Sequence, residues 1–317
     1  MTDRAARALV FAPSPLLTVT IEGRPDAEPE IHLHAGGQGV WIARMLATLG
    51  LEVQLCGPFG GESGALLVGL IERGGISVHA AAGASGNGAY IHDRRAGERH
   101  ELATVAPPVL NRHELDDLCN AVLVEGLDAD VVVLGGPDDD RALGPETYRR
   151  LAADLTKSGR LVVVDLSGPY LAEAAAGGAT VVKVSHEDLI EDGTATSEDL
   201  TDLVRAMSAL AASGAGTVVV SRAEQPTLAL AGGRLLEVRM PSFERVDHRG
   251  AGDSMTGGIA AALARGADLE SALRLGAAAG ALNATRRGLA TGEPGLIERL
   301  SERVTVQRLD REVPCEP

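Results

Sequence analysis

Residues 246–258 read Val-Asp-His-Arg-Gly-Ala-Gly-Asp-Ser-Met-Thr-Gly-Gly, and the expected fold is built around this stretch. Gly250 and Gly252 allow a tight turn that leaves backbone N–H groups open. A run of small and apolar residues, 255–264, follows and predicts a helix. The free N–H groups and the dipole at the start of a helix favour an anion. We therefore expect an anion-binding turn with the Asp253 carboxylate at its rim.

A carboxylate beside a bound phosphate is unfavourable because the two negative charges repel, so its presence in the turn suggests a chemical role. Taking a proton from an attacking hydroxyl would be such a role. The alternative is a glycine-rich turn in which Asp253 is an ordinary helix N-cap. The turn alone does not separate the two interpretations.

The turn resembles the Gly-Ala-Gly-Asp signature of the PfkB carbohydrate kinases, in the ribokinase superfamily. Residues 36–50, which begin Gly-Gly-Gln-Gly-Val-Trp-Ile-Ala-Arg, are similar to that family's N-terminal Gly-Gly-Lys-Gly-x-Asn-x-Ala-x-x-Leu-x-x-Leu-Gly. Residues 165–171 begin Asp-Leu-Ser-Gly and end in leucine, as in the 1-phosphofructokinase and tagatose-6-phosphate kinase branch. The resemblance runs from about residue 8 to 308. It implies one ribokinase-like domain over 1–317, an α/β three-layer sandwich with a small β-sheet lid.

The resemblance also implies the chemistry, which is phosphotransfer from ATP with Mg²⁺ to a hydroxyl of a sugar-like acceptor. Asp253 is then the catalytic base, and the backbone of Gly250, Ala251 and Gly252 stabilises charge on the transferring group. Positioning and charge stabilisation supply most of the catalysis in such reactions. The chain has no Walker A sequence. ATP is therefore expected at the carboxyl edge of the sheet.

Residues 181–189 resemble the family's Val-Lys-Pro-Asn-x-x-Glu-Leu. Lys183 is retained, while Ser185 replaces the asparagine that helps with phosphate and Mg²⁺. Glu187 is a candidate for the metal's water shell, or else a solvated glutamate at a helix start.

The nucleotide loop departs from the family, because residues 221–226 begin with Ser221 but lack the family's glycines. Pro226 also removes a backbone donor. Asn283 matches the region that lines the base pocket, although a polar residue in an alanine-rich helix can equally be a packing device. ATP affinity and nucleotide preference stay open.

The acceptor positions depart most from the family. Those implied by the resemblance are Thr18, Gly36, Gly37, Gln38 and Trp41. Thr18 stands for the sugar-binding aspartate, Gln38 for a lysine and Trp41 for an asparagine. A tryptophan in a helix is usually part of the core, but here its ring could stack on the acceptor. By the same comparison, Ser85-Gly86 replaces the Thr-Arg of the lid.

Two cations that would bind a sugar phosphate are thus missing. Each hydrogen bond to a charged group contributes about 1.5–3 kcal/mol. Losing both weakens sugar-phosphate binding by roughly a hundredfold to ten-thousandfold. We therefore expect a less charged acceptor, or one with a flat or apolar part. The alternatives are a sugar-phosphate kinase whose charge comes from Arg44, Arg94, Arg95 or Arg249, and a regulatory or binding protein on the kinase fold.

Composition restricts the class of protein further. The 317 residues are 45% apolar and only 2% aromatic, which predicts a sizeable core of Ala, Val and Leu. A net charge of −15 argues against nucleic acid as a partner. The three cysteines are widely spaced, which suits a reducing cytoplasm. No apolar run reaches the ~20 residues that span a bilayer, so no membrane partner is expected.

The order of apolar runs predicts the layers of the fold. Continuous runs at 131–134, 161–164, 181–184 and 217–220 are typical of parallel strands covered on both faces. More polar, alternating stretches within 16–34 and 88–104 predict the lid sheet, whose edges and apolar face suit a homodimer contact. Asn111 with Glu114 predicts a capping box, and Ser197 is expected to cap the helix that reaches residue 212.

Overall fold

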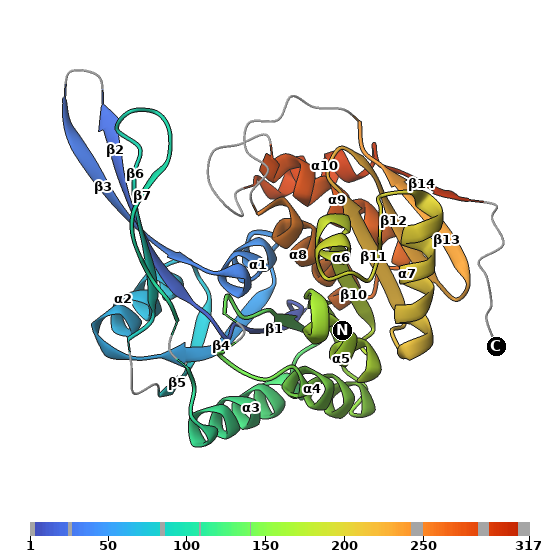
Figure 1. Cartoon of the computed structure of the whole chain (residues 1–317), viewed down its shortest axis with the longest axis horizontal. Helices are drawn as coiled ribbons and strands as arrows, with labels where there is room; N and C mark the ends of the chain where they lie inside the picture. The colour runs from blue at the N-terminus through green and yellow to red at the C-terminus, as the bar shows by residue number, and fades with distance from the viewer. Residues whose placement is uncertain are drawn as a thin grey trace.

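The computed structural model describes residues 4–24, 27–82, 86–107, 109–139, 141–241, 250–284 and 292–309. Two sheets organise these residues. The larger has ten strands in the order β14-β13-β12-β11-β10-β9-β8-β1-β4-β5, and the smaller has four in the order β3-β2-β6-β7. Figure 1 shows the small sheet projecting from one side of the body that is built on the large sheet.

The large sheet is mainly parallel. Its strands from β11 to β5 run parallel, and β12, β13 and β14 extend it antiparallel at one edge. The ten strands are β1 Arg7–Phe11, β4 Glu52–Phe59, β5 Ser77–Ala82, β8 Val131–Gly135, β9 Leu161–Asp165, β10 Val181–Ser185, β11 Thr217–Arg222, β12 Gln225–Ala231, β13 Arg234–Arg239 and β14 Thr305–Arg308.

Helices cover both faces of this sheet. On one face, α1, α8, α9 and α10 contribute to the core with Val10, Val133 and their neighbours. On the other, α3, α4, α5 and α7 pack with Leu9, Leu134 and theirs. The helices are α1 Gln38–Thr48, α2 Gly61–Glu72, α3 Arg112–Gly126, α4 Glu146–Lys157, α5 Gly168–Ala176, α6 His186–Glu191, α7 Leu200–Ser213, α8 Ala251–Ala264, α9 Leu269–Ala284 and α10 Pro294–Ser301. The expected three-layer α/β sandwich is therefore confirmed.

The valine runs explain why these strands lie at the centre. Val131, Val132, Val133 and Leu134 are each 0% exposed, because alternate side chains enter the two cores on opposite faces of the sheet. β-branched side chains suit such a pleated, fully covered surface. All carboxyl ends of the parallel strands then meet at one edge, where loops collect side chains for chemistry.

The small sheet consists of β2 Leu16–Arg24, β3 Ala27–Gly36, β6 Gly88–Asp93 and β7 His100–Val105. Cross-strand pairs share a face. Thr18 pairs with His34 and with Tyr90, which in turn pairs with Thr104, so this face is polar. The opposite face is apolar, with pairs such as Val19–Leu33, Val19–Ile91 and Ile21–Ile31. Its outer part is open to solvent, because Ile31 is 68% and Leu33 is 42% exposed.

Some local expectations need correction. The signature helix was expected from residue 255, but α8 begins at Ala251, so Gly250 is the N-cap and Asp253 lies in the first turn. Ser197 does not cap α7, which starts after Asp199. The side chain of Asp202, a residue of α7, instead accepts the Ser197 N–H. The capping box of Asn111 and Glu114 is present as expected.

Several predicted positions lie outside the described residues. They are 246–249 of the signature stretch, including Arg249, Ser85 of the lid pair, and Cys315. Cys56 and Cys119 are both free and buried. Among the helices within the described ranges, none combines the length and apolarity that a bilayer crossing requires.

Helices α8 and α9 approach closely through glycine. A Cβ on Gly276 would lie 2.5 Å from Ile259 Cγ1 and 2.8 Å from the Met255 carbonyl oxygen. A Cβ on Gly69, in α2, would meet nothing within 4 Å. The two positions make a matched pair of helical glycines, one packed and one open.

We predict that Gly276→Ala destabilises the protein by about 1–3 kcal/mol, because the added methyl group overpacks the α8–α9 contact. Gly69→Ala should instead stabilise it by roughly 0.5–1 kcal/mol, since alanine restricts the unfolded chain more than glycine. Urea unfolding monitored by circular dichroism measures both. Equal stabilities for the two variants would show that the contact is not tight.

Candidate active site

The first turn of α8 forms the centre of the site. Gly250 adopts a left-handed conformation, with φ 70° and ψ 5°, that glycine tolerates and other residues rarely adopt. The helix then starts at Ala251 and carries Asp253 in its first turn. The first N–H groups of a helix have no partner within it, so this turn can bind an anion.

Directly behind the turn lies a buried ion pair. Lys183 Nζ is 3.1 Å from Asp165 Oδ1, and both side chains are 7% exposed. Asp165 Oδ2 also accepts a 2.6 Å hydrogen bond from Thr256 Oγ1 of α8. Lys183 Nζ would lie only 2.6 Å from a Cβ on Gly252, so the ammonium group reaches the turn only because that residue is glycine. The network joins β9, β10 and the start of α8.

The charges around Asp253 adjust its basicity. Burial and the Asp165 carboxylate raise the pKa of Asp253 to about 7, Asp138 raises it further, and Lys183 acts in the opposite direction. Burial alone would lower the pKa of Lys183, but Asp165 and Asp253 hold it above its ordinary value. Lys183 is therefore a fixed positive charge, whereas Asp253 can exchange a proton near neutral pH.

The nucleotide-side residues lie at the neighbouring strand ends. Ser185 ends β10 and pairs in register with Ser221 of β11. Ser185 is also the N-cap of α6, where it forms a capping box with Asp188. Asn283 is 1% exposed and lies in the last turn of α9. A nucleotide role for these residues stays a prediction, and the burial of Asn283 suits the packing alternative as well.

The loop after β11 is a tight hairpin rather than an open glycine loop. Ala223 has a φ of 41°, in the left-handed region that normally favours glycine. The Arg222 guanidinium folds back on the hairpin, because its Nε donates to the Pro226 carbonyl at 2.7 Å. Hydrogen bonds within the hairpin thus fix a backbone that lacks the expected glycines.

The acceptor-side residues gather where α1 begins. Gly36 ends β3, and a Cβ there would lie 2.9 Å from Thr18 Oγ1. Gly37 is the N-cap of α1, at a φ of 97°. Gln38 Oε1 accepts a 2.5 Å hydrogen bond from the Gly136 N–H, which ties α1 to the loop after β8. Trp41 is partly buried and packs against the core, in agreement with the structural alternative for this residue.

The arginines named as replacement cations differ in their contacts. Arg95 Nη2 lies 2.6 Å from Asp93 Oδ2, and Arg94 lies 3.9 Å from Glu22, so carboxylates already neutralise both. Arg44, on α1, forms no hydrogen bond or ion pair with any residue in the described part of the chain. Burial lowers the pKa of Arg44, and the pKa of nearby His34 is lowered first by burial and then by the Arg44 charge. Of the candidate arginines within the described ranges, Arg44 alone has no carboxylate partner there.

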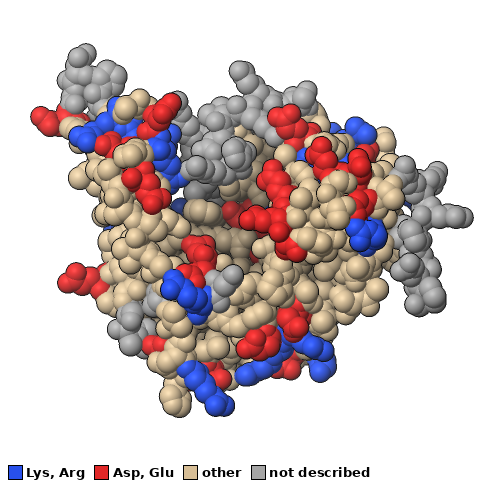
Figure 2. All heavy atoms as spheres, viewed as in Figure 1, with Lys and Arg blue, Asp and Glu red and all other residues tan. Residues whose placement is uncertain are grey.

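A cavity of about 200 Å³ lies between the small sheet and the loop after β8. The residues around it are Leu16, Gly88, Tyr90, Thr104, Val105, Ala106, Pro107, Asp138 and Asp139. Figure 2 shows a hollow between the small sheet and the rest of the molecule, with acidic side chains along its walls. Asp138 is one of the residues of this cavity, and its charge also raises the pKa of Asp253, which does not line the cavity itself.

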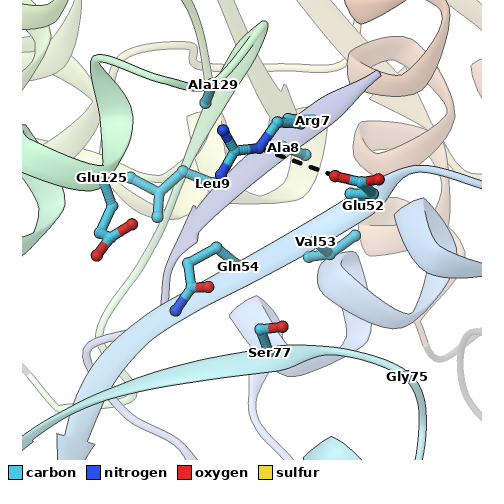
Figure 3. Close-up of a pocket in the computed structure, with 10 residues that line it drawn as sticks. All are labelled: Arg7, Ala8, Leu9, Glu52, Val53, Gln54, Gly75, Ser77, Glu125 and Ala129. Atoms are coloured by element: carbon cyan, nitrogen blue, oxygen red, sulfur yellow. Dashed lines mark ion pairs between the residues drawn. The ribbon is translucent and has the colours of Figure 1, made fainter. Parts of the chain in front are cut away.

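A second cavity, of about 210 Å³, lies at the opposite edge of the large sheet. It is formed at the amino ends of β1, β4 and β5, where Arg7 and Glu52 point toward each other at 3.9 Å (Figure 3). A five-residue strand at ~3.3 Å per residue separates the two edges by roughly 16 Å. This cavity therefore takes no part in chemistry at Asp253.

The described residues contain no cluster of three or more His, Cys, Asp or Glu side chains arranged for a metal ion. Mg²⁺, which the family resemblance implies, takes most of its ligands in kinases from substrate phosphates and water, beside one or two carboxylates. Glu187 is exposed at the start of α6, immediately after β10, and is available as such a carboxylate.

A three-layer α/β fold with a carboxylate in the first turn of a helix is an arrangement that suits a small-molecule phosphotransferase. The chain belongs to the pfkB family of carbohydrate kinases, whose family model matches residues 12–295. It is a carbohydrate kinase, and membership of this family implies ATP as the phosphoryl donor.

Two curated relatives are fructose-phosphate kinases. The ATP-dependent 6-phosphofructokinase isozyme 2 of Escherichia coli is 30% identical over 294 residues, which cover 88% of this chain and 92% of the relative. The 1-phosphofructokinase of Rhodobacter capsulatus is 30% identical over 269 residues, covering 82% and 84%.

Solved structures agree in fold. E. coli phosphofructokinase-2 in complex with potassium matches with a TM-score of 0.81 and 25% identity, covering 94% of this chain and 98% of that one. Arabidopsis thaliana ribokinase with ribose and ATP matches with a TM-score of 0.72 and 19% identity, covering 94% and 99%. The predicted ribokinase-like fold is thus confirmed.

Sequence reasoning missed several residues of the site. Asp165 was noted only as part of a branch motif, and Thr256 and Asp138 were not considered. For Asp138 a signal existed: Gly135-Gly136-Pro137-Asp138 directly follows an apolar strand, at the edge where parallel strands end. The sequence alone does not show how the order of strands in the sheet brings this loop toward α8.

We predict that Asp253→Asn lowers kcat by about a hundredfold or more, because the amide keeps the shape but cannot take the proton. With the wild-type protein, kcat/KM should fall as the pH drops below about 7, since protonation of the raised-pKa carboxylate removes the base. A coupled ADP-release assay from pH 5.5 to 9 measures both. Near wild-type turnover in the variant, with the same acid limb, would contradict the assignment.

Proposed function

We propose that this kinase uses Asp253 as its base to transfer the γ-phosphoryl group of ATP to a hydroxyl of a sugar-like acceptor. The observation that carries the proposal is the raised pKa of Asp253 beside the open N–H groups of the α8 turn. The acceptor oxygen forms a bond to phosphorus as the bond to ADP breaks, and the hydroxyl proton passes to Asp253. The N–H groups from Gly250 to Gly252 stabilise charge on the phosphoryl oxygens.

Mg²⁺, when bound with the nucleotide, supplies further positive charge to the phosphates. Glu187 is the residue we assign to its water shell. Lys183 supports the turn from behind, because its ammonium group is buried against Gly252 and Asp165. Ser185, Ser221 and Asn283 are proposed on the nucleotide side, and Thr18, Gly36, Gly37, Gln38 and Trp41 on the acceptor side.

We further propose that the acceptor is not a sugar phosphate. Among the described residues around the 200 Å³ cavity there is no lysine or arginine, and of its two aspartates Asp139 is paired with Arg141 while Asp138 has no ion-pair partner in the described part of the chain. A phosphate dianion in such a place would meet uncompensated negative charge. A neutral or amine-bearing sugar avoids this conflict.

A sugar phosphate remains the second candidate, for a specific reason. Arg44 lies near His34 on the polar side of the small sheet, and among the described residues nothing neutralises it. The two relatives described above are also named as fructose-phosphate kinases. A third candidate, a regulatory protein without turnover, is disfavoured because the Asp253 turn is intact.

ADP release over a panel of sugars, amino sugars, sugar phosphates and nucleosides separates these candidates. We expect the highest kcat/KM on an unphosphorylated acceptor, and values for fructose 1-phosphate below the ordinary enzyme range of about 10⁴ M⁻¹s⁻¹. Efficient turnover of a sugar phosphate, lost in Arg44→Gln, would establish the second candidate instead. No ADP release on any acceptor would favour the regulatory protein.

We also propose a homodimer through the apolar face of the small sheet. The exposed Ile31 and Leu33 would cost free energy if left in water. Light scattering should give a dimer for the wild-type protein and a monomer for Leu33→Lys. Val124→Lys is the matched control, because Val124 is 66% exposed on α3 and far from that face in the fold. A monomeric wild-type protein at high concentration would refute this interface.

A further inference from the structure

The loop between β8 and α4 places a carboxylate at the 200 Å³ cavity beside the small sheet. Asp138 is exposed to solvent and lies among the residues of the 200 Å³ cavity. Its side chain forms no hydrogen bond or ion pair within the described part of the chain. By contrast, Asp139 next to it is neutralised by Arg141 at 2.6 Å. Asp138 is thus the available acceptor of hydrogen bonds on this wall.

The backbone of the loop is fixed on both sides of this residue. The Asp138 N–H donates to Ser14 Oγ at 3.1 Å, and Ser14 is only 5% exposed. Two residues earlier, the Gly136 N–H donates to Gln38 Oε1 at 2.5 Å. Ser14 lies in the loop after β1, and Gln38 is the first residue of α1. The backbone that carries Asp138 is therefore fixed by Ser14 and by Gln38, one of the residues predicted on the acceptor side.

The opposite wall of the cavity lacks the carboxylate that the family resemblance led us to expect. The strand β2 contributes Leu16, which is 4% exposed, while Thr18 lies farther along the strand against Gly36. Tyr90 and Thr104 add a ring and a hydroxyl from the small sheet. An acceptor entering here meets an apolar side chain, an aromatic ring and one free carboxylate.

We propose that Asp138 is the residue that selects the acceptor, accepting hydrogen bonds from the hydroxyl or ammonium groups of a sugar that carries no anionic substituent. The proposal rests on the proposed phosphotransfer at Asp253 and deepens it by naming the substrate class. Carboxylates are strong acceptors toward such donors, and each hydrogen bond to a charged group contributes tenfold or more to binding. An anionic ester in the same position would be repelled by Asp138 and Asp253 together.

The electrostatics agree with this position. The charged groups that act on Asp253 come from three elements: Asp165 of β9, Lys183 of β10 and Asp138 of the β8–α4 loop. Removing the Asp138 charge should therefore lower the pKa of Asp253.

Asp138→Asn and Asp138→Ala test the proposal in the full-length protein, with Asp154→Asn on the exposed surface of α4 as a charge-matched control. The assay measures kcat and KM for glucose, glucosamine, fructose and fructose 1-phosphate, and KM for ATP. We expect both variants to raise KM for the best acceptor at least tenfold and to change KM for ATP less than twofold. The acid limb of kcat/KM should move to lower pH in Asp138→Asn, and the control should match the wild type.

Isothermal calorimetry of acceptor binding without ATP makes the result independent of turnover. Weaker binding of the unphosphorylated sugars to Asp138→Asn than to the wild type supports the proposal. This holds even if no ADP is released, because a lack of ADP release refutes only the proposed phosphotransfer. Tighter binding of glucosamine than of glucose would identify an ammonium group as the donor. Unchanged acceptor affinity in both variants, or a sugar phosphate as the best ligand, overturns the role of Asp138 while phosphotransfer stands.

Discussion

The buried pair of Lys183 and Asp165 is the interaction on which the site depends. Each ion has left water, so each needs the other, and breaking such a pair by removing one partner is strongly destabilising. Through Thr256, Asp165 also ties α8 to the strand ends. Lys183 is the only cation that acts on Asp253 within the set of groups that shift its pKa, whereas Asp165 and Asp138 both repel its charge. Among the described groups that shift the pKa of Asp253, Lys183 thus supplies the positive charge that offsets the two carboxylates.

Small residues make this arrangement sterically possible. Lys183 approaches the turn because Gly252 has no side chain, and Gly257 lets α8 lie against Met45 of α1. Gly276 lets α9 lie against Ile259 and Met255 of α8. Close packing of this kind favours alanine and glycine over large side chains, which explains how a chain with 2% aromatic residues builds a compact core. The composition and the position of the first turn of α8 thus have a common cause.

The sequence predicted those features that depend on local pattern. The valine runs determine the parallel strands, and Gly250 determines the tight turn that starts α8 and carries Asp253. The start of α8 was misplaced, because glycine and aspartate have low helix propensity and the tertiary contacts of Gly252 and Thr256 override it. Asp138 could not be assigned, since its role depends on a loop that meets the small sheet only after folding. Asn283 and Trp41 show the same limit, because burial and ligand binding leave similar patterns in a helix.

The raised pKa of Asp253 also makes the stability of the folded protein depend on pH. The folded protein holds this proton up to a pH of about 7, whereas an ordinary aspartate releases it near 3.8. The folded state therefore binds more protons than the unfolded state between these values, and stability falls as the pH rises through that interval. Above it, the carboxylate is ionised in both states, and the folded protein keeps a charge that burial disfavours. The form that can accept a proton is thus the less stable form, which is the relation expected where a buried group is retained for chemistry.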